Sequence, residues 1–187
     1  MTIGKEERKV SRTEMLISQF HASAILMAGT AGGLDRTRLK LYDVVVSDYI
    51  ICNSHLTHSS AVCLDSGKWI DCKNSLFYSF LNLHQQKKQD FKFKVLYGGI
   101  QTCNYFVENA PVTNKNNYSD YGTILCVEQE SFGVASMCTK LYTPFLIIKG
   151  ISDFADTPLA KLKRKDFLRA ANNASFCIFE LISCLIS

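Results

Sequence analysis

The chain has 187 residues, of which 47% are hydrophobic and 20% are charged, and its formal net charge is +4. This composition excludes an intrinsically disordered protein and predicts one globular domain with a sizeable core. The basic residues are dispersed except for a short run at 161–165, which is more typical of a solvated loop than of a nucleic-acid interface. We therefore expect no nucleic acid among the partners.

The eight cysteines are dispersed along the chain, and several lie inside apolar runs. This distribution is typical of free thiols that pack as small core residues, and no CxxC pair or Cys/His spacing indicates a metal site. The N-terminus lacks the apolar region of a signal peptide. The longest apolar stretch, 176–186, is too short to span a bilayer and contains Glu180. The sequence thus predicts a cytoplasmic protein with neither a bound metal nor a membrane partner.

Segments of strand-like composition alternate with segments of helical spacing along the chain. Strands are predicted at 24–28, at 43–47 with a continuation at 49–52, at 91–97 with its end at Gly98-Gly99, at 122–127 and at 144–150. Helices are predicted at 13–20, 75–84 and 131–141 and from about residue 166 to the C-terminal end. The glycine-rich segment 29–33 is interpreted as a turn, and 111–120 as a surface loop. This alternation predicts an α/β fold, with a mixed central β-sheet flanked by helices.

Two carboxylates, Glu130 and Asp153, each follow one of the predicted strands, with one helix-length segment between them. Ligands of open parallel sheets bind in the crevice outside the carboxyl ends of the strands, so both acids are expected to face one pocket. Taken alone, an acid such as Asp153 after a strand is most often a helix N-cap, but in this segment Asp156 is the preferred candidate for that cap.

Four motifs follow one another along the chain: GTAGGL at 29–34, LYDVVVSD at 41–48, VEQE at 127–130 and ISDFAD at 151–156. In order and spacing they resemble the nucleoside phosphorylase superfamily, and most of all its hydrolytic branch, the 5′-methylthioadenosine/S-adenosylhomocysteine nucleosidases. The resemblance implies a nucleoside phosphorylase-like single domain that hydrolyses the N-glycosidic bond of adenine nucleosides, in methionine salvage, without a cofactor and as a homodimer. Two rivals stay open: a phosphate-dependent purine nucleoside phosphorylase, and a noncatalytic nucleoside-binding or sensor domain.

The resemblance also implies roles for individual residues. Asp153 matches the acid that protonates or hydrogen-bonds the purine N7, and Ser152 positions it. Glu130 matches the carboxylate that holds the ribose hydroxyls, and Gln129 stands where the sugar pocket usually has methionine. Thr30 replaces the usual serine beside the sugar and the attacking water.

Further binding residues come from the same resemblance. Gly32 belongs to the substrate-binding glycine-rich motif. Phe106 matches the aromatic residue that stacks on the base, with Tyr105 as its rival, and Val107 offers backbone hydrogen bonds beside it. Glu128 is expected to face solvent or a neighbouring chain.

The departures from the family pattern also carry expectations. The segment 2–5 resembles the GIGK sequence that follows the first strands of the family, so the domain at 1–187 is expected to lack a front section on the order of 40 residues, about one β-α-β unit. That section holds the glutamate that activates the attacking water. Tyr42 replaces a usual glycine. Met27 stands where phosphorylases carry a phosphate-binding arginine, which favours hydrolysis.

Overall fold

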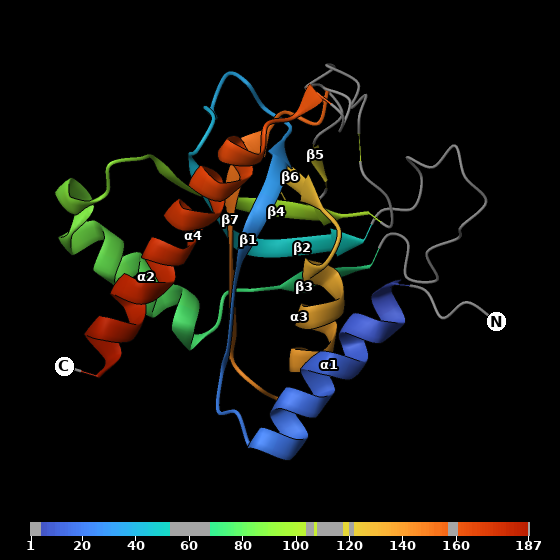
Figure 1. The fold of residues 1–187 in the computed structure, drawn as a ribbon. Helices are drawn as coiled ribbons and strands as arrows, with labels where there is room; N and C mark the ends of the chain where they lie inside the picture. The colour runs from blue at the N-terminus through green and yellow to red at the C-terminus, as the bar shows by residue number, and fades with distance from the viewer. Residues whose placement is uncertain are drawn as a thin grey trace.

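A computed structural model describes residues 5–52, 68–103, 107, 118–119, 122–156 and 161–186. Within them a central sheet is covered by helices on both faces (Figure 1). The strands are β1 Ile25–Gly33, β2 Val44–Cys52, β3 Trp69–Asp71, β4 Val95–Thr102, β5 Tyr118–Ser119, β6 Gly122–Glu128 and β7 Phe145–Asp153. The helices are α1 Lys5–Phe20, α2 Ser75–Gln86, the short 3₁₀ helix η1 Lys88–Asp90, α3 Ser131–Lys140 and α4 Arg164–Leu185. The predicted mixed α/β architecture is confirmed.

The sheet has the strand order β1-β7-β2-β4-β6-β5, with β3 beside β2. Parallel pairs join β1 to β7, β2 to β4 and β4 to β6, whereas β2 runs antiparallel to β7. The last residues of β1 also pair antiparallel with β6, where Gly32 is the partner of Val127. The path β1-β7-β2-β4-β6 therefore returns to β1. This closure brings the C-terminal ends of β1, β6 and β7 together.

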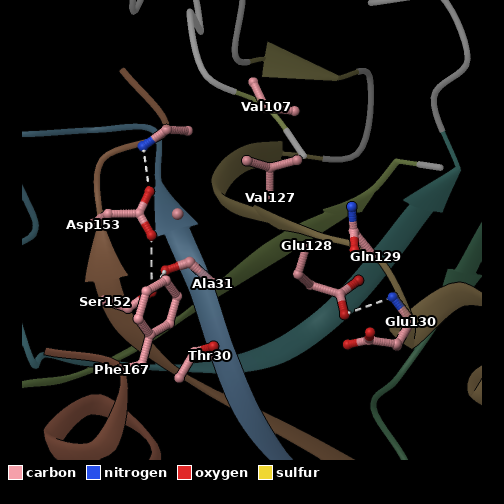
Figure 2. A pocket seen from close by; sticks show the side chains of 12 residues that line it. Thr30, Ala31, Val107, Val127, Glu128, Gln129, Glu130, Ser152, Asp153 and Phe167 are labelled. Carbon is pink, nitrogen blue, oxygen red and sulfur yellow. Dashed lines mark hydrogen bonds between the residues drawn. The ribbon is translucent and has the colours of Figure 1, made fainter. Parts of the chain in front are cut away.

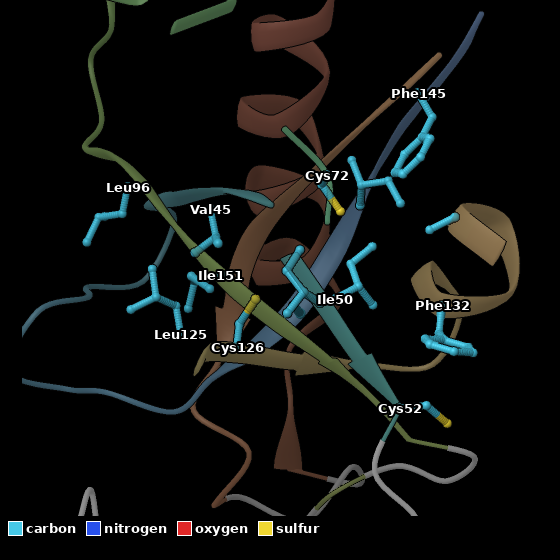
Figure 3. Packing of buried hydrophobic residues seen from close by; sticks show 14 of the residues in the cluster. Val45, Ile50, Cys52, Cys72, Leu96, Leu125, Cys126, Phe132, Phe145 and Ile151 are labelled. Carbon is cyan, nitrogen blue, oxygen red and sulfur yellow. The ribbon is translucent and has the colours of Figure 1, made fainter. Parts of the chain in front are cut away.

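Two apolar layers hold the helices on the sheet. On one face, side chains of α2 and α4 such as Phe80 and Cys177 pack on Val46 and Ile148. On the other face, α3 contributes Phe132 and α1 contributes the partly buried Ile17, and the core there includes side chains of β2, β6 and β7 (Figure 3). A fully buried aliphatic side chain stabilises a fold by about 1.5–3 kcal/mol. Every residue of β7 is buried, so packing holds the end of this strand in place.

Several predicted boundaries are wrong for tertiary reasons. The segment 29–33 is the second half of β1 instead of a turn, because it pairs in register with β7 and then with β6. Similarly, Gly99 lies inside β4, where a Cβ would come within 2.3 Å of the Tyr49 ring. Both glycine segments mark close approaches within a strand.

Six described cysteines are free, and five of these are buried, as expected for thiols that pack as small core residues. Cys52, the last residue of β2, is disulfide-bonded, so the free-thiol prediction is wrong at that position. None of the described helices combines the length and the hydropathy that a membrane-spanning helix requires.

Candidate active site

A cavity of about 290 Å³ lies where the ends of β1, β6 and β7 meet (Figure 2). Seven residues that the sequence singles out line it: Thr30, Gly32, Val107, Gln129, Glu130, Ser152 and Asp153. Phe106 and its rival Tyr105 lie outside the described residues, so their stacking role stays a prediction. Five further lining residues were not predicted: Ala31, Val127, Glu128, Ala155 and Phe167. The expectation that Glu130 and Asp153 share one pocket is thus met by the geometry.

Asp153 owes its position to an irregularity at the end of β7. The pairing of β1 with β7 slips by one residue, so that Ala31 faces Ile151 while Gly32 faces Asp153, and Ser152 is left as the extra residue. Such bulges re-aim side chains and are frequent beside active sites. A Cβ on Gly32 would lie 3.0 Å from Asp153 Oδ1. Only glycine therefore lets β1 run this close to the acid.

Two hydrogen bonds fix the carboxyl group of Asp153, a residue that is 6% exposed. Ser152 Oγ donates to Oδ2 at 2.8 Å, as the positioning role predicted for this serine requires, and the backbone N–H of Ala155 donates to Oδ1 at 2.8 Å (Figure 2). Because α4 begins after Lys163, its N-cap residue, Asp153 does not cap that helix. Asp156 does not cap it either, and instead forms an ion pair with Arg36 at 2.6 Å.

Glu130 lies at the opposite side of the cavity, at the junction of β6 and α3. It is the N-cap residue of α3, but its side chain makes no capping hydrogen bond. Its carboxylate instead lies 3.8 Å from the Lys149 ammonium group, and its side chain is 38% exposed. Figure 2 shows Glu130 and Asp153 on opposite sides of the cavity. This arrangement leaves room for a ligand that engages one acid at each end.

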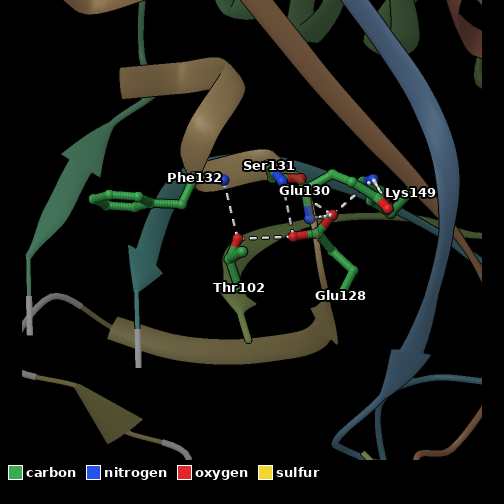
Figure 4. A network of polar contacts seen from close by, with 6 residues as sticks. All are labelled: Thr102, Glu128, Glu130, Ser131, Phe132 and Lys149. Atoms are coloured by element: carbon green, nitrogen blue, oxygen red, sulfur yellow. Dashed lines mark hydrogen bonds and ion pairs between the residues drawn. The ribbon is translucent and has the colours of Figure 1, made fainter. Parts of the chain in front are cut away.

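Glu128 contradicts the expectation that it faces solvent. Its side chain is 3% exposed and pairs with Lys149, itself 1% exposed, at 2.9 Å. The same carboxylate accepts hydrogen bonds from the Thr102 hydroxyl at 2.7 Å and from the backbone N–H groups of Glu130 and Ser131 at 2.8 and 3.0 Å (Figure 4). It therefore caps α3 in place of Glu130. A buried charge needs such partners, because unpaired it would lose its solvation.

The pKa of Glu128 reflects this network. Burial alone would raise it, but the charge of Lys149, the hydrogen bond from that ammonium group and the donors on Ser131 and Thr102 hold the pKa below its usual value. Glu128 therefore stays ionised and committed to its partners.

Lys149 is the sequence signal that could have revealed this network. It interrupts the apolar run of β7, and lysine is almost never fully buried unless it is paired. Its ammonium group would come within 3.0 Å of a Cβ on Gly29, so the glycine makes room for it. The pattern predicts a partner for Lys149 but not which acid it is, because Glu128 comes from a separate strand.

The remaining walls of the cavity are mostly apolar. Val127 packs with Ala155 in a small cluster to which Val107 adds, while Phe167 from α4 stands near Thr30 (Figure 2). None of the described lining residues is a lysine or an arginine. Among the described residues, the site thus offers a mostly apolar space between two carboxyl groups, with no lysine or arginine in its lining.

This combination, an α/β sheet whose strand ends present two separated acids to an apolar cavity, defines a small-molecule site of the kind found at sheet edges. The profile of the phosphorylase superfamily matches residues 2–184. The chain therefore belongs to the phosphorylase superfamily.

Individual relatives of this chain are named as nucleosidases. The chain is 28% identical to the 5′-methylthioadenosine/S-adenosylhomocysteine nucleosidase of Marinomonas sp. (strain MWYL1), a match that covers 96% of this chain and 77% of that protein. Its fold is similar to that of the Helicobacter pylori nucleosidase of the same name, complexed with a compound that joins an amino-pyrrolopyrimidine to a pyrrolidinol, with a TM-score of 0.78 and 20% identity over 97% of this chain and 77% of the other.

A second solved structure is equally similar. The futalosine hydrolase of Helicobacter pylori strain 26695 matches with a TM-score of 0.78 and 20% identity, over 97% of this chain and 76% of the other. At such identities the likeness of the solved structures shows the fold alone, and it confirms the predicted fold class.

Proposed function

We propose that this protein binds adenine nucleosides in the cavity between Asp153 and Glu130 and hydrolyses their N-glycosidic bond. The observation that carries the proposal is the convergence of these two acids on one cavity from the ends of β7 and β6. One relative is named a nucleosidase, and one solved structure of a nucleosidase contains a nucleoside-like compound. Both support the same substrate class.

In the proposed reaction the base lies at the Asp153 end and the ribose at the Glu130 end. As the bond between C1′ and the purine breaks, its electron pair moves onto the base, and Asp153 supplies a proton to N7 or shares one with it. Glu130 accepts hydrogen bonds from the ribose hydroxyls while positive charge grows on the sugar. A water oxygen bonds to C1′ and releases one proton to the solvent, from which Asp153 regains the proton that it gave to the base, so that the products are free adenine and the sugar. An acid at the base and a carboxylate near the sugar are the groups that this charge separation requires.

The remaining predicted residues are assigned to binding. Thr30 and Gln129 offer a hydroxyl and an amide to the sugar, and Gly32 keeps the backbone close beneath it. Val107 lines the cavity and would offer backbone hydrogen bonds to the base. Among the described residues we assign no group to activating the water, because Glu128 is already held by Lys149 and its other donors.

Water is a better candidate than phosphate for the attacking group. A phosphate dianion needs a cation beside the sugar, and no described lining residue supplies one. Lys149 is buried behind the cavity against two carboxylates, and Met27 packs against the core.

The test is to follow adenine release from 5′-methylthioadenosine and S-adenosylhomocysteine by chromatography, with and without added phosphate. Phosphate-independent release with a free sugar product supports the proposal. Release that requires phosphate and yields a sugar 1-phosphate would replace hydrolysis by phosphorolysis. If calorimetry shows that adenosine binds but no adenine is released, the nucleoside-binding site is supported and the catalytic role is refuted.

A further inference from the structure

Tyr42 has an unusual backbone for its residue type. It immediately precedes Asp43 at the entry to β2, and its φ is 72°, in the left-handed region that favours glycine. A non-glycine residue in that region costs on the order of 1–3 kcal/mol and persists only when its surroundings hold it. The contacts of Tyr42 show what holds it.

Three residues on α4 contact Tyr42. Its hydroxyl donates a hydrogen bond to Asp166 Oδ1 at 2.6 Å, its ring lies under the guanidinium group of Arg169 at 4.3 Å, and its carbonyl accepts from Asn173 Nδ2 at 2.7 Å. Residues spaced by three and four positions share one face of a helix. Tyr42 thus fixes consecutive turns of the N-terminal half of α4. The hydrogen bond to Asp166 also raises the pKa of the Tyr42 hydroxyl, which keeps the group protonated and donating.

The other side of Tyr42 faces the strand that carries the acid. Its backbone N–H donates to the carbonyl of Ile151 at 2.8 Å, two residues before Asp153. On α4, Phe167 follows Asp166 directly and lines the cavity. Tyr42 therefore contacts both the end of β7 and helix α4. Helix α4 supplies Phe167 to the cavity lining.

We propose that Tyr42 is a positioning residue that sets the place of Phe167 relative to Asp153 and thereby the width of the cavity. This inference rests on the proposed function for its ligand, an adenine nucleoside, but its structural part is measurable without any ligand. Tyr42 is not among the described residues that line the cavity, so its side chain acts on the site through α4.

The test compares Tyr42→Phe with a matched control at the far end of the same helix. Tyr42→Phe removes the hydrogen bond to Asp166 and keeps the ring beneath Arg169. Glu180→Gln removes the pair with Lys87, which ties the C-terminal part of α4 to the end of α2 at 3.1 Å. Both changes remove one interaction with α4, but only the first lies beside Phe167.

For Tyr42→Phe we expect the Kd and the KM for the nucleoside to rise about fivefold, the effect of about one hydrogen bond. We expect kcat to stay within about twofold because the hydrogen bonds of Asp153 are untouched. Tyr42→Phe in an Asp166→Ala background should add nothing further. Glu180→Gln should leave Kd and KM unchanged. Equal effects of the two variants on Kd, or no effect of Tyr42→Phe, would overturn the inference.

Hydrogen exchange separates a failure of this inference from a failure of the proposed function. Tyr42→Phe should speed amide exchange in residues 164–174, and Glu180→Gln should speed it only nearer the C-terminal end. If the wild-type protein binds no adenine nucleoside, the proposed function fails while the exchange result still decides whether Tyr42 fixes α4. Unchanged exchange in Tyr42→Phe would refute the positioning role directly.

Discussion

Replacing Lys149 with methionine tests the buried network behind the cavity. Methionine nearly preserves the volume of the lysine stem and removes only the ammonium group, which lies 2.9 Å from Glu128 and 3.8 Å from Glu130. The substitution leaves the Glu128 carboxylate buried without its cation. The hydrogen bonds from Thr102 and from the backbone of α3 stay in place.

The expected loss follows from the burial of the pair. Removing one partner of a buried ion pair costs about 3–5 kcal/mol, because the other charge is left uncompensated. The hydrogen bonds that Glu128 keeps partly solvate its charge, so we expect the low end of this range, about 3 kcal/mol of unfolding free energy. The less buried pair of Lys87 and Glu180, whose side chains are 44% and 17% exposed, provides the control, and Lys87→Met should cost less than about 1 kcal/mol.

The pH dependence gives the prediction its signature. In the wild-type protein the pKa of Glu128 is lowered from about 4.5. Its contribution to stability is therefore present above that pH and is lost as the pH falls through the folded-state pKa. In Lys149→Met, burial still raises the pKa of Glu128, but the charge of Lys149 no longer lowers it. The carboxylate therefore takes up a proton at a higher pH, and its neutral form costs less to bury. The stability gap between the two proteins should be widest near neutral pH and should narrow in acid.

Urea unfolding followed by circular dichroism, at neutral pH and near pH 4.5, measures this gap for both variants. A loss below about 1 kcal/mol for Lys149→Met, or a loss equal to that of Lys87→Met, would refute the assigned burial of the charge. So would a gap that widens in acid.

Three further substitutions test the cavity itself. Asp153→Asn should lower turnover by about two to four orders of magnitude, the range for a general acid, with thermal melting little changed; a parallel loss of fold and activity would instead indicate a structural role. Glu130→Gln should weaken the binding of adenosine far more than that of free adenine, measured by calorimetry, and equal losses for the two ligands would show that this acid does not hold the sugar. Gly32→Ala places a Cβ 2.9 Å from that of Ala155 and 3.0 Å from Asp153 Oδ1, so we expect about 1–3 kcal/mol of destabilisation together with reduced turnover, and unaltered kinetics would contradict the close approach.

The sequence predicted the two acids of the candidate site because each follows an apolar run that had to be a strand. The ends of such strands meet at a sheet edge, and this local pattern was enough to bring Glu130 and Asp153 to one cavity. The fold class followed from the same alternation and from motifs that span the chain.

What sequence reasoning missed depends on contacts between distant segments. Glu128 and Glu130 both follow the same apolar run, and the sequence does not reveal that Glu128 pairs with Lys149 on another strand. The segment 29–33 has turn composition, but pairing with two strands extends it. Phe167 was not predicted to line the cavity, because helical spacing does not reveal that the first turns of α4 reach beyond the sheet.

The double pairing of Gly32 has a consequence for how this site can change. Gly32 is in register with Asp153 on one side and with Val127 on the other, and adjacent strands lie about 4.8 Å apart. The span between the two acid-bearing strands is therefore about two strand spacings, and main-chain hydrogen bonds maintain it. Substitutions at Thr30, Gln129 or Phe167 can alter which molecule fits while the frame that separates the acids keeps its dimensions. For the proposed reaction, the choice of substrate would therefore be separable from the geometry of bond cleavage.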